Sequence, residues 1–170
     1  MIRSAIELEP SNPIFHHNRG FCFRNIGDYP HAVDDYSTAI RLDPTNAPAY
    51  NNRGYAWRKL GRFEDAIMDY SASLAIETTN VKSFNNRAYC FAKTGKYTEA
   101  IADYGAVIRL DGSNVHAYHN RGISYDKIGE FTLAIEDFTR VVQLDPTNAN
   151  AYFNRGSTQD SLGAFDKVSE

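Results

Sequence analysis

Apolar side chains between residues 47 and 80 recur at helical spacing in two short runs. The first run contains Tyr50, Tyr55 and Trp57, and the second contains Ala66, Ile67, Tyr70 and Leu74. This pattern fits two amphipathic helices better than strands. Gly61 separates the runs, and glycine is typical of a helix C-terminus because it adopts a left-handed backbone without a Cβ clash. The segment is therefore predicted to be a helix-turn-helix.

The same pattern recurs every 34 residues along the chain. The triplet Asn18-Arg19-Gly20 returns as Asn52-Arg53-Gly54, Asn86-Arg87-Ala88, Asn120-Arg121-Gly122 and Asn154-Arg155-Gly156. The same step relates the glycines Gly27, Gly61, Gly95, Gly129 and Gly163, the alanines Ala32, Ala66, Ala100 and Ala134, and the aromatics Tyr36, Tyr70, Tyr104 and Phe138. Small residues facing alanines let two helices approach closely while aromatic rings fill the space beside them.

Small residue, aromatic, glycine, aromatic, alanine, aromatic and proline at these spacings resemble the tetratricopeptide repeat family. The resemblance implies an all-α fold, a right-handed superhelical α-solenoid of helix-turn-helix repeats. It divides a single array over residues 1–170 into a remnant of a preceding repeat at 1–12, full repeats at 13–46, 47–80, 81–114 and 115–148, and a truncated repeat at 149–170. Thr78 and Gly112 replace the closing proline of the family, and Ala88 replaces its glycine.

Both ends of the expected array fall inside repeats and lack polar caps, which exposes core surface in a solenoid. The exposed apolar residues are expected to be Ile2, Ile6 and Leu8 at one end and Tyr152, Leu162 and Phe165 at the other. Self-association into a homo-oligomer through these terminal half-repeats is one hypothesis. A monomeric mass in light scattering at high concentration contradicts it.

The net charge and the distribution of apolar residues argue against nucleic acid and membranes as partners of this protein. A formal net charge of -3 disfavours nucleic acid, because phosphate backbones are repelled on average. No apolar run approaches the roughly 18 residues of a membrane span, so no membrane partner is expected. With only two cysteines, Cys22 and Cys90, we expect buried free thiols in a reducing compartment. The protein is therefore expected to be cytoplasmic.

Catalytic and metal sites are not expected in this sequence. His116 and His119 lie one helical turn apart, but no cysteine or further histidine follows them closely enough to complete a metal site. No serine or cysteine nucleophile stands beside a histidine and an acid, and the glycines are dispersed at repeat positions. The expectation is a protein that is not an enzyme and has no cofactor.

The family resemblance places one asparagine per repeat on a concave wall, which is formed by the first of the two helices in each repeat. These residues are Asn18, Asn52, Asn86, Asn120 and Asn154, and they resemble the asparagine ladder of the tetratricopeptide superhelix in O-linked N-acetylglucosamine transferases. A side-chain amide can both donate to and accept from a peptide unit. With first helices about 10 Å apart and an extended chain rising about 3.3 Å per residue, an asparagine meets about every third residue. The alternative is that these asparagines tie neighbouring helices together.

The arginine beside each asparagine shares its period with an aspartate on the second helix. The expected structural ion pairs involve Arg53, Arg87 and Arg121 with Asp35, Asp69, Asp103 and Asp137. Spacing alone leaves open whether Arg53 pairs with Asp35 or with Asp69. Gripping of ligand carboxylates by these arginines is the functional alternative.

The expected neighbours of the asparagines are basic and aromatic. The peptide-binding candidates are Tyr55, Tyr89, Arg58, Lys59, Lys82, Lys93 and Lys127, with His17, Phe21, Arg24, Asn51, Asn85, His119 and Ile123 on the same face. This set favours extended segments that are acidic or bear carboxylates. The carboxylate clamp of chaperone-binding family members fits poorly, because His17 and Phe21 occupy its leading lysine and asparagine positions.

Three functions are compatible with the sequence. The leading hypothesis is a protein-protein interaction scaffold that binds extended peptide segments on its concave face through the asparagine ladder. A second is a substrate-recruiting arm of a larger enzyme such as a glycosyltransferase. A third is an architectural module that self-associates through its uncapped ends.

Overall fold

The computed structural model describes residues 2–169, and within them it contains ten helices and no strand. Residue contacts divide the chain into two compact units, Met1–Cys90 and Phe91–Glu170. Unit 1 holds α1 (Ile2–Leu8), α2 (Pro13–Asn25), α3 (Tyr29–Leu42), α4 (Ala47–Lys59), α5 (Phe63–Ile76) and most of α6 (Val81–Lys93). Unit 2 holds the end of α6, α7 (Tyr97–Leu110), α8 (Val115–Lys127), α9 (Phe131–Leu144) and α10 (Ala149–Ser169).

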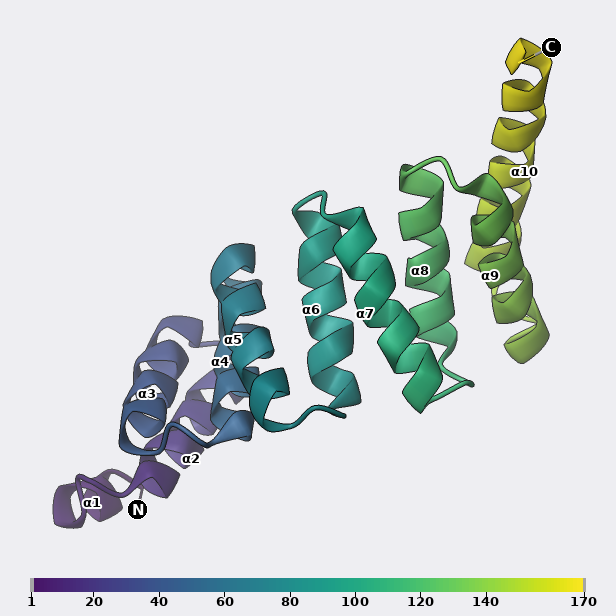
Figure 1. Ribbon diagram of the computed structural model, residues 1–170. Coiled ribbons are helices and arrows are strands. Elements are labelled where there is room, and N and C mark those ends of the chain that lie inside the picture. Colours follow the sequence, from purple (N-terminus) through teal and green to yellow (C-terminus); the bar gives the residue numbers. More distant parts are fainter. Residues whose placement is uncertain (1, 170) are drawn as a thin grey trace. The chain divides into compact units, whose positions relative to one another are not determined.

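Consecutive helices pack against one another within each unit (Figure 1). In unit 1, α2 packs against α3, α3 against α4 and α4 against α5; in unit 2, α7 packs against α8, α8 against α9 and α9 against α10. First helices such as α4 have 13 residues and second helices such as α5 have 14. Because only a few residues join them, paired helices run antiparallel as hairpins.

A glycine with a left-handed backbone ends the first helix of four hairpins. Gly61 has φ 76°, and Gly27, Gly95 and Gly129 have values between 77° and 82°. Gly61 N–H donates to the Arg58 carbonyl, and Arg62 N–H donates to the Trp57 carbonyl. These two bonds form a Schellman motif, which satisfies the last carbonyls of α4 and reverses the chain.

An asparagine side chain caps the start of each of the helices α2, α4, α6, α8 and α10, the first helices of their hairpins. Asn46 Oδ1 accepts a 2.9 Å hydrogen bond from Ala49 N–H, and Asn12, Asn80, Asn114 and Asn148 cap their helices in the same manner. The cap satisfies a backbone donor that has no partner inside the helix. These asparagines form a second series at the 34-residue period, distinct from the series that begins at Asn18.

The core of unit 1 is built where a second helix is covered by the first helices on both sides. Tyr36 of α3 is fully buried and clusters with Ala32, Val33 and Ala56. Tyr70 of α5 clusters in the same way with Ala66 and Cys90. A Cβ at Gly20 would lie 3.1 Å from the Tyr36 ring, so the small residue allows α2 and α3 to approach closely.

The prediction that both cysteines are buried is wrong for Cys22. Cys90 is fully buried, whereas Cys22 is exposed, although the two occupy the same repeat position. The reason is the helix that precedes each one. Cys90 packs against Tyr70 of the 14-residue α5, but Cys22 follows α1, which has only seven residues.

The fifth glycine also behaves differently from the expected pattern. Gly163 lies inside α10, which continues to Ser169, and its φ is not positive. The chain therefore stays helical where a turn was expected.

The apolar residues expected at the ends of the array are only partly exposed. Leu8 is 84% exposed and Tyr152 is 45% exposed, whereas Ile6 and Leu162 are half-buried. The side chains of Ile2 and Phe165 lie outside those that the structure describes. None of the helices in the described residues combines the length and apolar character needed to cross a membrane.

Candidate functional site

A polar groove of about 440 Å³ lies across the first helices of unit 1. We call it the unit 1 groove, and it is lined by Arg24, Pro48, Asn51, Asn52, Tyr55, Asn80, Lys82, Asn85 and Asn86. Its lining includes two cations and five amides but no carboxylate. The groove is therefore rich in hydrogen-bond donors and complementary to a negatively charged ligand.

Asn52 has both ends of its amide occupied within unit 1. Its Oδ1 accepts a 2.7 Å hydrogen bond from Arg24 Nη1, and its Nδ2 donates to His17 Nε2 at 3.1 Å. The second bond requires an unprotonated His17 Nε2. Burial lowers the pKa of His17, the Asn18 side chain raises it and the Arg24 charge lowers it, with a net lowering that favours the neutral ring. Asn52 thus ties α4 to α2.

Asn51 is also engaged by neighbouring helices. Its Nδ2 donates a 2.5 Å hydrogen bond to Ser83 Oγ of α6, and Ser83 Oγ lies 3.1 Å from Ser73 Oγ of α5. By contrast, the Asn85 and Asn86 side chains form no hydrogen bond to any residue that the structure describes, although both line the unit 1 groove. These two amides are free to bind a ligand.

Aromatic rings and cations alternate along the same first helices. The Arg24 guanidinium carbon lies 4.5 Å from the Phe21 ring centre and 5.5 Å from that of Tyr55. The Arg58 guanidinium carbon lies 5.0 Å from the Tyr55 ring centre and 5.1 Å from that of Tyr89. We call Phe21, Arg24, Tyr55, Arg58 and Tyr89 the arginine-tyrosine stack. Each cation lies within the range of favourable cation-π contact.

Lys59 adds a further cation beside the stack. Its Nζ lies 5.5 Å from the Tyr55 ring centre. Arg24, Arg58 and Lys59 all fall in the last turn of their helices, where a positive charge interacts favourably with the helix dipole. The last turns of α2 and α4 therefore carry a positive stripe next to the groove.

The arginines that follow the asparagines have a different role from Arg24 and Arg58. Arg53 Nε donates to Asp69 Oδ2 at 2.8 Å, and Arg53 Nη2 donates to Asp69 Oδ1 at 2.6 Å. Arg53 Nη1 also donates to Ser37 Oγ of α3 at 2.9 Å. Arg53 thus pairs with Asp69 rather than with Asp35, and it connects α4 to both adjacent second helices.

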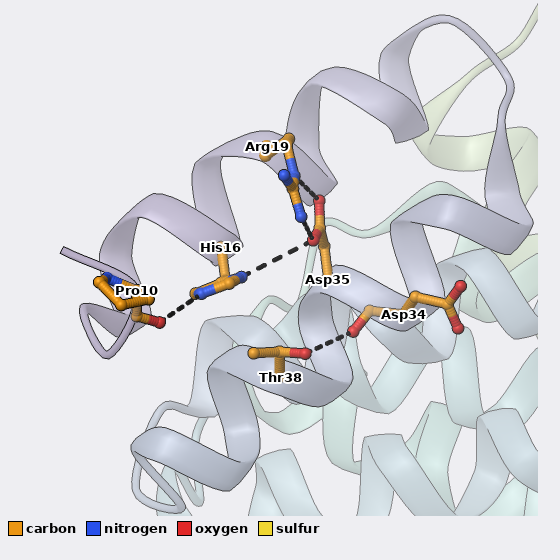
Figure 2. Close-up of polar contacts among 6 residues, drawn as sticks. All are labelled: Pro10, His16, Arg19, Asp34, Asp35 and Thr38. Atoms are coloured by element: carbon orange, nitrogen blue, oxygen red, sulfur yellow. Dashed lines mark hydrogen bonds and ion pairs between the residues drawn. The ribbon is translucent and has the colours of Figure 1, made fainter. Parts of the chain in front are cut away.

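Figure 2 shows the same pairing at the first hairpin, where Arg19 grips both carboxylate oxygens of Asp35. His16 lies on the other side of that carboxylate, with its Nε2 2.8 Å from the Pro10 carbonyl and its Nδ1 3.8 Å from Asp35 Oδ1. Asp34 projects away from this cluster. Arg121 and Asp137 form the equivalent pair in unit 2, and Arg87 donates to Ser71 Oγ at 3.0 Å.

Unit 2 carries the remaining predicted positions with different surroundings. Asn154 Nδ2 lies 3.5 Å from His119 Nε2, a longer version of the contact between Asn52 and His17. Lys127 is exposed and Asn120 is half-buried. Asp126 accepts a 2.8 Å hydrogen bond from Thr158. In the described residues, no three His, Cys, Asp or Glu side chains gather in a way that could hold a metal ion.

Two family profiles match the sequence. One, described as "TPR repeat", matches residues 22–61 and 89–129, and the other, described as "Tetratricopeptide repeat", matches residues 47–80 and 115–148. Together they cover more than half of the chain. The chain belongs to the tetratricopeptide repeat family. A comparison with curated protein sequences gives no significant match.

Solved tetratricopeptide structures share the fold. The crystal structure of the MamA protein has a TM-score of 0.87 and 23% identity, covering 92% of this chain and 86% of that one. YrrB, described as a TPR protein with an unusual peptide-binding site, has a TM-score of 0.87 and 21% identity, with coverage of 95% and 84%. The first TPR of Spaghetti (RPAP3), bound to the HSP90 peptide SRMEEVD, has a TM-score of 0.67 and 25% identity, with coverage of 71% and 96%.

The tetratricopeptide hairpins bring together only part of the predicted site. The unit 1 groove contains Asn52, Asn86, Tyr55 and Lys82, while Arg58, Lys59 and Tyr89 lie in or beside the arginine-tyrosine stack. Asn18 is exposed on α2 and does not line the groove. Lys93, Lys127, Asn120 and Asn154 belong to unit 2.

Two groove residues were not predicted from the sequence. Asn80 caps α6 and Pro48 lies in the first turn of α4, yet both line the groove. The 34-residue series of capping asparagines is the signal that would have identified Asn80. Pro48 has no equivalent signal, because proline in a first helical turn has a structural explanation of its own.

Proposed function

We propose that this tetratricopeptide protein is an interaction module that binds an extended peptide segment in the unit 1 groove. The observation that carries the proposal is the lining of the groove, which has two cations and five amides without a carboxylate. Side-chain amides suit a peptide backbone because they donate and accept at once. A segment laid across the first helices would use main-chain hydrogen bonds for affinity and side-chain pockets for specificity.

We propose further that the bound segment is acidic. Arg24 and Lys82 line the groove, and Arg58 and Lys59 extend the positive charge along α4. The RPAP3 tetratricopeptide domain, at 25% identity, is bound to a peptide that contains two glutamates and an aspartate. That likeness supports a peptide ligand with carboxylates. His17 and Phe21 in place of the clamp lysine and asparagine argue against a chaperone tail as this protein's own ligand.

The asparagines are assigned two different roles in this proposal. Asn85 and Asn86 contact the backbone of the ligand, since their amides have no partner in the described residues. Asn52 positions Arg24, since its carbonyl oxygen accepts from the guanidinium and its amide nitrogen donates to His17. A ligand that used Asn52 directly would first have to displace these two contacts.

A peptide-binding measurement with three variants tests the proposal. Fluorescein-labelled acidic peptides from a random library are selected on the wild-type protein, and their affinity is measured by fluorescence anisotropy for Asn86→Ala, Lys82→Gln and Asn150→Ala. Loss of one or two hydrogen bonds to a ligand costs about 1 kcal/mol each, so Asn86→Ala is expected to weaken binding about fivefold to thirtyfold. Lys82→Gln is expected to weaken binding more at low salt than at high salt.

Asn150 serves as the control because it is exposed on α10, outside the groove. Asn150→Ala should leave the affinity unchanged, and circular dichroism should show that all three variants keep their helicity. If Asn86→Ala and Lys82→Gln bind the selected peptides as tightly as the wild type does, the unit 1 groove is not the binding site.

A further inference from the structure

The arginines of unit 1 fall into two groups that differ in their partners. Arg19 and Arg53 each hold a buried aspartate with two hydrogen bonds. Arg24 and Arg58 have no carboxylate within ion-pair distance among the residues that the structure describes. Their positive charges are therefore not neutralised by any acid in the described part of the chain.

Arg58 is held between two tyrosine rings. The Tyr55 and Tyr89 rings lie 5.0 and 5.1 Å from its guanidinium carbon. Its Nε is closed off from solvent and has no hydrogen-bond partner in the described part of the chain. The buried Nε cannot reach a ligand, so the two Nη groups at the end of the oriented guanidinium are the donors available to one.

Arg24 is oriented by similar contacts. Its guanidinium stacks on Phe21 and Tyr55, and its Nη1 and Nη2 donate to Asn52 Oδ1 at 2.7 Å and Asn25 Oδ1 at 3.3 Å. Two neutral acceptors fix its direction but leave its charge and its remaining N–H groups for a ligand. Preorganised donors of this kind lower the entropic cost of binding.

Tyr55 limits the distance between the two guanidinium groups, because both lie against its ring. Arg24 and Arg58 lie 5.5 and 5.0 Å from the centre of this one ring. Their guanidinium carbons are consequently separated by at most about 10.5 Å, which is about the length of three residues of extended chain at about 3.3 Å each. Residues two or three apart in an extended segment can therefore reach both groups.

We propose that the arginine-tyrosine stack recognises a pair of carboxylates two or three residues apart in the bound segment, one on Arg24 and the other on Arg58. This inference rests on the proposed function and names its ligand more closely. One planar guanidinium fork matches one carboxylate and forms two charge-assisted hydrogen bonds with it. The arginine-tyrosine stack thus selects segments by the spacing of their acidic residues, whereas the amides of Asn85 and Asn86 form hydrogen bonds with the backbone of the segment.

The sequence confines this recognition to unit 1. At the repeat position of Arg24 and Arg58, the following repeats carry Ala92, Asp126 and Asp160. Asp126 already accepts from Thr158, and an aspartate at this position repels a ligand carboxylate. The acid pair should therefore dock on unit 1 alone.

Peptides of equal charge test the spacing. Fluorescein-labelled twelve-residue peptides in a serine-alanine background carry two glutamates at positions i and i+2, i and i+3, or i and i+7, and a fourth peptide carries two glutamines. Anisotropy should show the i+2 or the i+3 peptide binding at least fivefold more tightly than the i+7 peptide. Equal affinity for all three acidic peptides would overturn the proposal, because charge alone would then explain the binding.

Variants locate the acids on the two arginines. Arg58→Gln should weaken the best-spaced peptide about tenfold and remove its advantage over the i+7 peptide. Arg58→Lys keeps the charge but loses the fork, so it should restore only part of the affinity. The matched control is Arg62→Gln, because Arg62 stacks on Trp57 at 5.2 Å but already has Asp65 as an acid partner at 2.7 Å.

The outcomes separate this inference from the proposed function. If Arg58→Gln binds the best-spaced peptide as tightly as the wild type does while Asn86→Ala binds more weakly, the proposal of peptide binding in the unit 1 groove stands. The proposal that Arg24 and Arg58 recognise a pair of carboxylates is then overturned. No binding of any acidic peptide, together with no effect of Asn86→Ala on selected peptides, would overturn both. A change in Arg62→Gln as large as that in Arg58→Gln would also contradict a specific role for the stack.

Discussion

Arg53 of α4 and Asp69 of α5 form a two-point ion pair, with hydrogen bonds of 2.8 and 2.6 Å between the guanidinium and the carboxylate. The Asp69 side chain is 6% exposed and that of Arg53 is 20% exposed. The pair connects the two helices of one hairpin, and Ser37 on the Arg53 guanidinium extends the connection to the preceding hairpin. Its equivalents, Arg19 with Asp35 and Arg121 with Asp137, repeat the arrangement.

Removing one partner of this pair should destabilise the fold. Asp69→Asn leaves the Arg53 charge without its carboxylate in a poorly solvated place, and we expect the free energy of unfolding to fall by about 3 kcal/mol. Asp65→Asn is the control, because Asp65 pairs with Arg62 whose side chain is 61% exposed. Its expected cost is at most about 1 kcal/mol. Urea unfolding followed by circular dichroism measures both, and equal losses would contradict a structural role for Asp69.

Close packing at the small-residue position should make Gly122→Ala unfavourable. A Cβ there would lie 2.9 Å from Cε1 of Phe138, a ring that is only 1% exposed. We expect a net loss of about 1 to 2 kcal/mol, because the steric cost exceeds the gain in helix propensity. Thermal unfolding measures the loss.

The matched control for this substitution is Gly156→Ala. Gly156 has the same repeat position, but nothing lies within 4 Å of a Cβ built on it. Alanine should therefore stabilise α10 by about 0.5 to 1 kcal/mol through helix propensity alone. Two changes of the same sign would show that packing against the second helix does not decide the effect.

Acid should disrupt the hydrogen bond between Asn52 and His17. The pKa of His17 lies below its ordinary value of 6.5, chiefly because burial disfavours the charged ring. A histidine with a lowered pKa stabilises the folded state above pH 6.5, and this contribution is lost as the pH falls through the lower folded-state pKa. Protonation also removes the lone pair of Nε2 that accepts from Asn52.

NMR titration of the His17 ring protons should accordingly give a midpoint below 6.5, with a parallel shift of the Asn52 side-chain amide signals. In a His17→Gln variant the Asn52 amide signals should stay constant over the same pH range. A His17 midpoint above 6.5 would contradict the buried, neutral ring.

The two thiols should react at very different rates. Burial raises the pKa of Cys90 to about 12, and its side chain is inaccessible, whereas Cys22 is exposed. We expect a thiol-reactive disulfide reagent at pH 8 to modify one equivalent rapidly in the native protein and the second only after unfolding. Cys22→Ser should abolish the rapid phase, and its persistence in that variant would contradict the burial of Cys90.

The helical hairpins are predictable from the sequence because the information that encodes them is local. Gly61 ends α4 at the position where a left-handed backbone is needed, and the apolar runs around Trp57 and Tyr70 have the helical period. The 34-residue recurrence of both features indicates a repeat before any contact is known. Gly163 is the exception, because it lies inside α10 and its φ is not positive.

The groove is only partly predictable, for a different physical reason. Spacing places Asn52 and Asn86 at the same point of their helices, yet only Asn52 has its amide occupied, because His17 and Arg24 on α2 reach it. A repeat period shows which residues are equivalent but not what covers each one.

The sequence by itself determined the helices, their pairing and the small and aromatic positions that lock each pair, because these depend on residues close together in the chain. Only the tertiary structure decided that Arg53 forms its ion pair with Asp69 and that Arg58 has no acid partner among the described residues. It also decided that Cys22 is exposed while Cys90 is buried. Each of these outcomes depends on the side chains of a neighbouring helix. Whether such a side chain is long enough and suitably placed to make contact cannot be read from the 34-residue period.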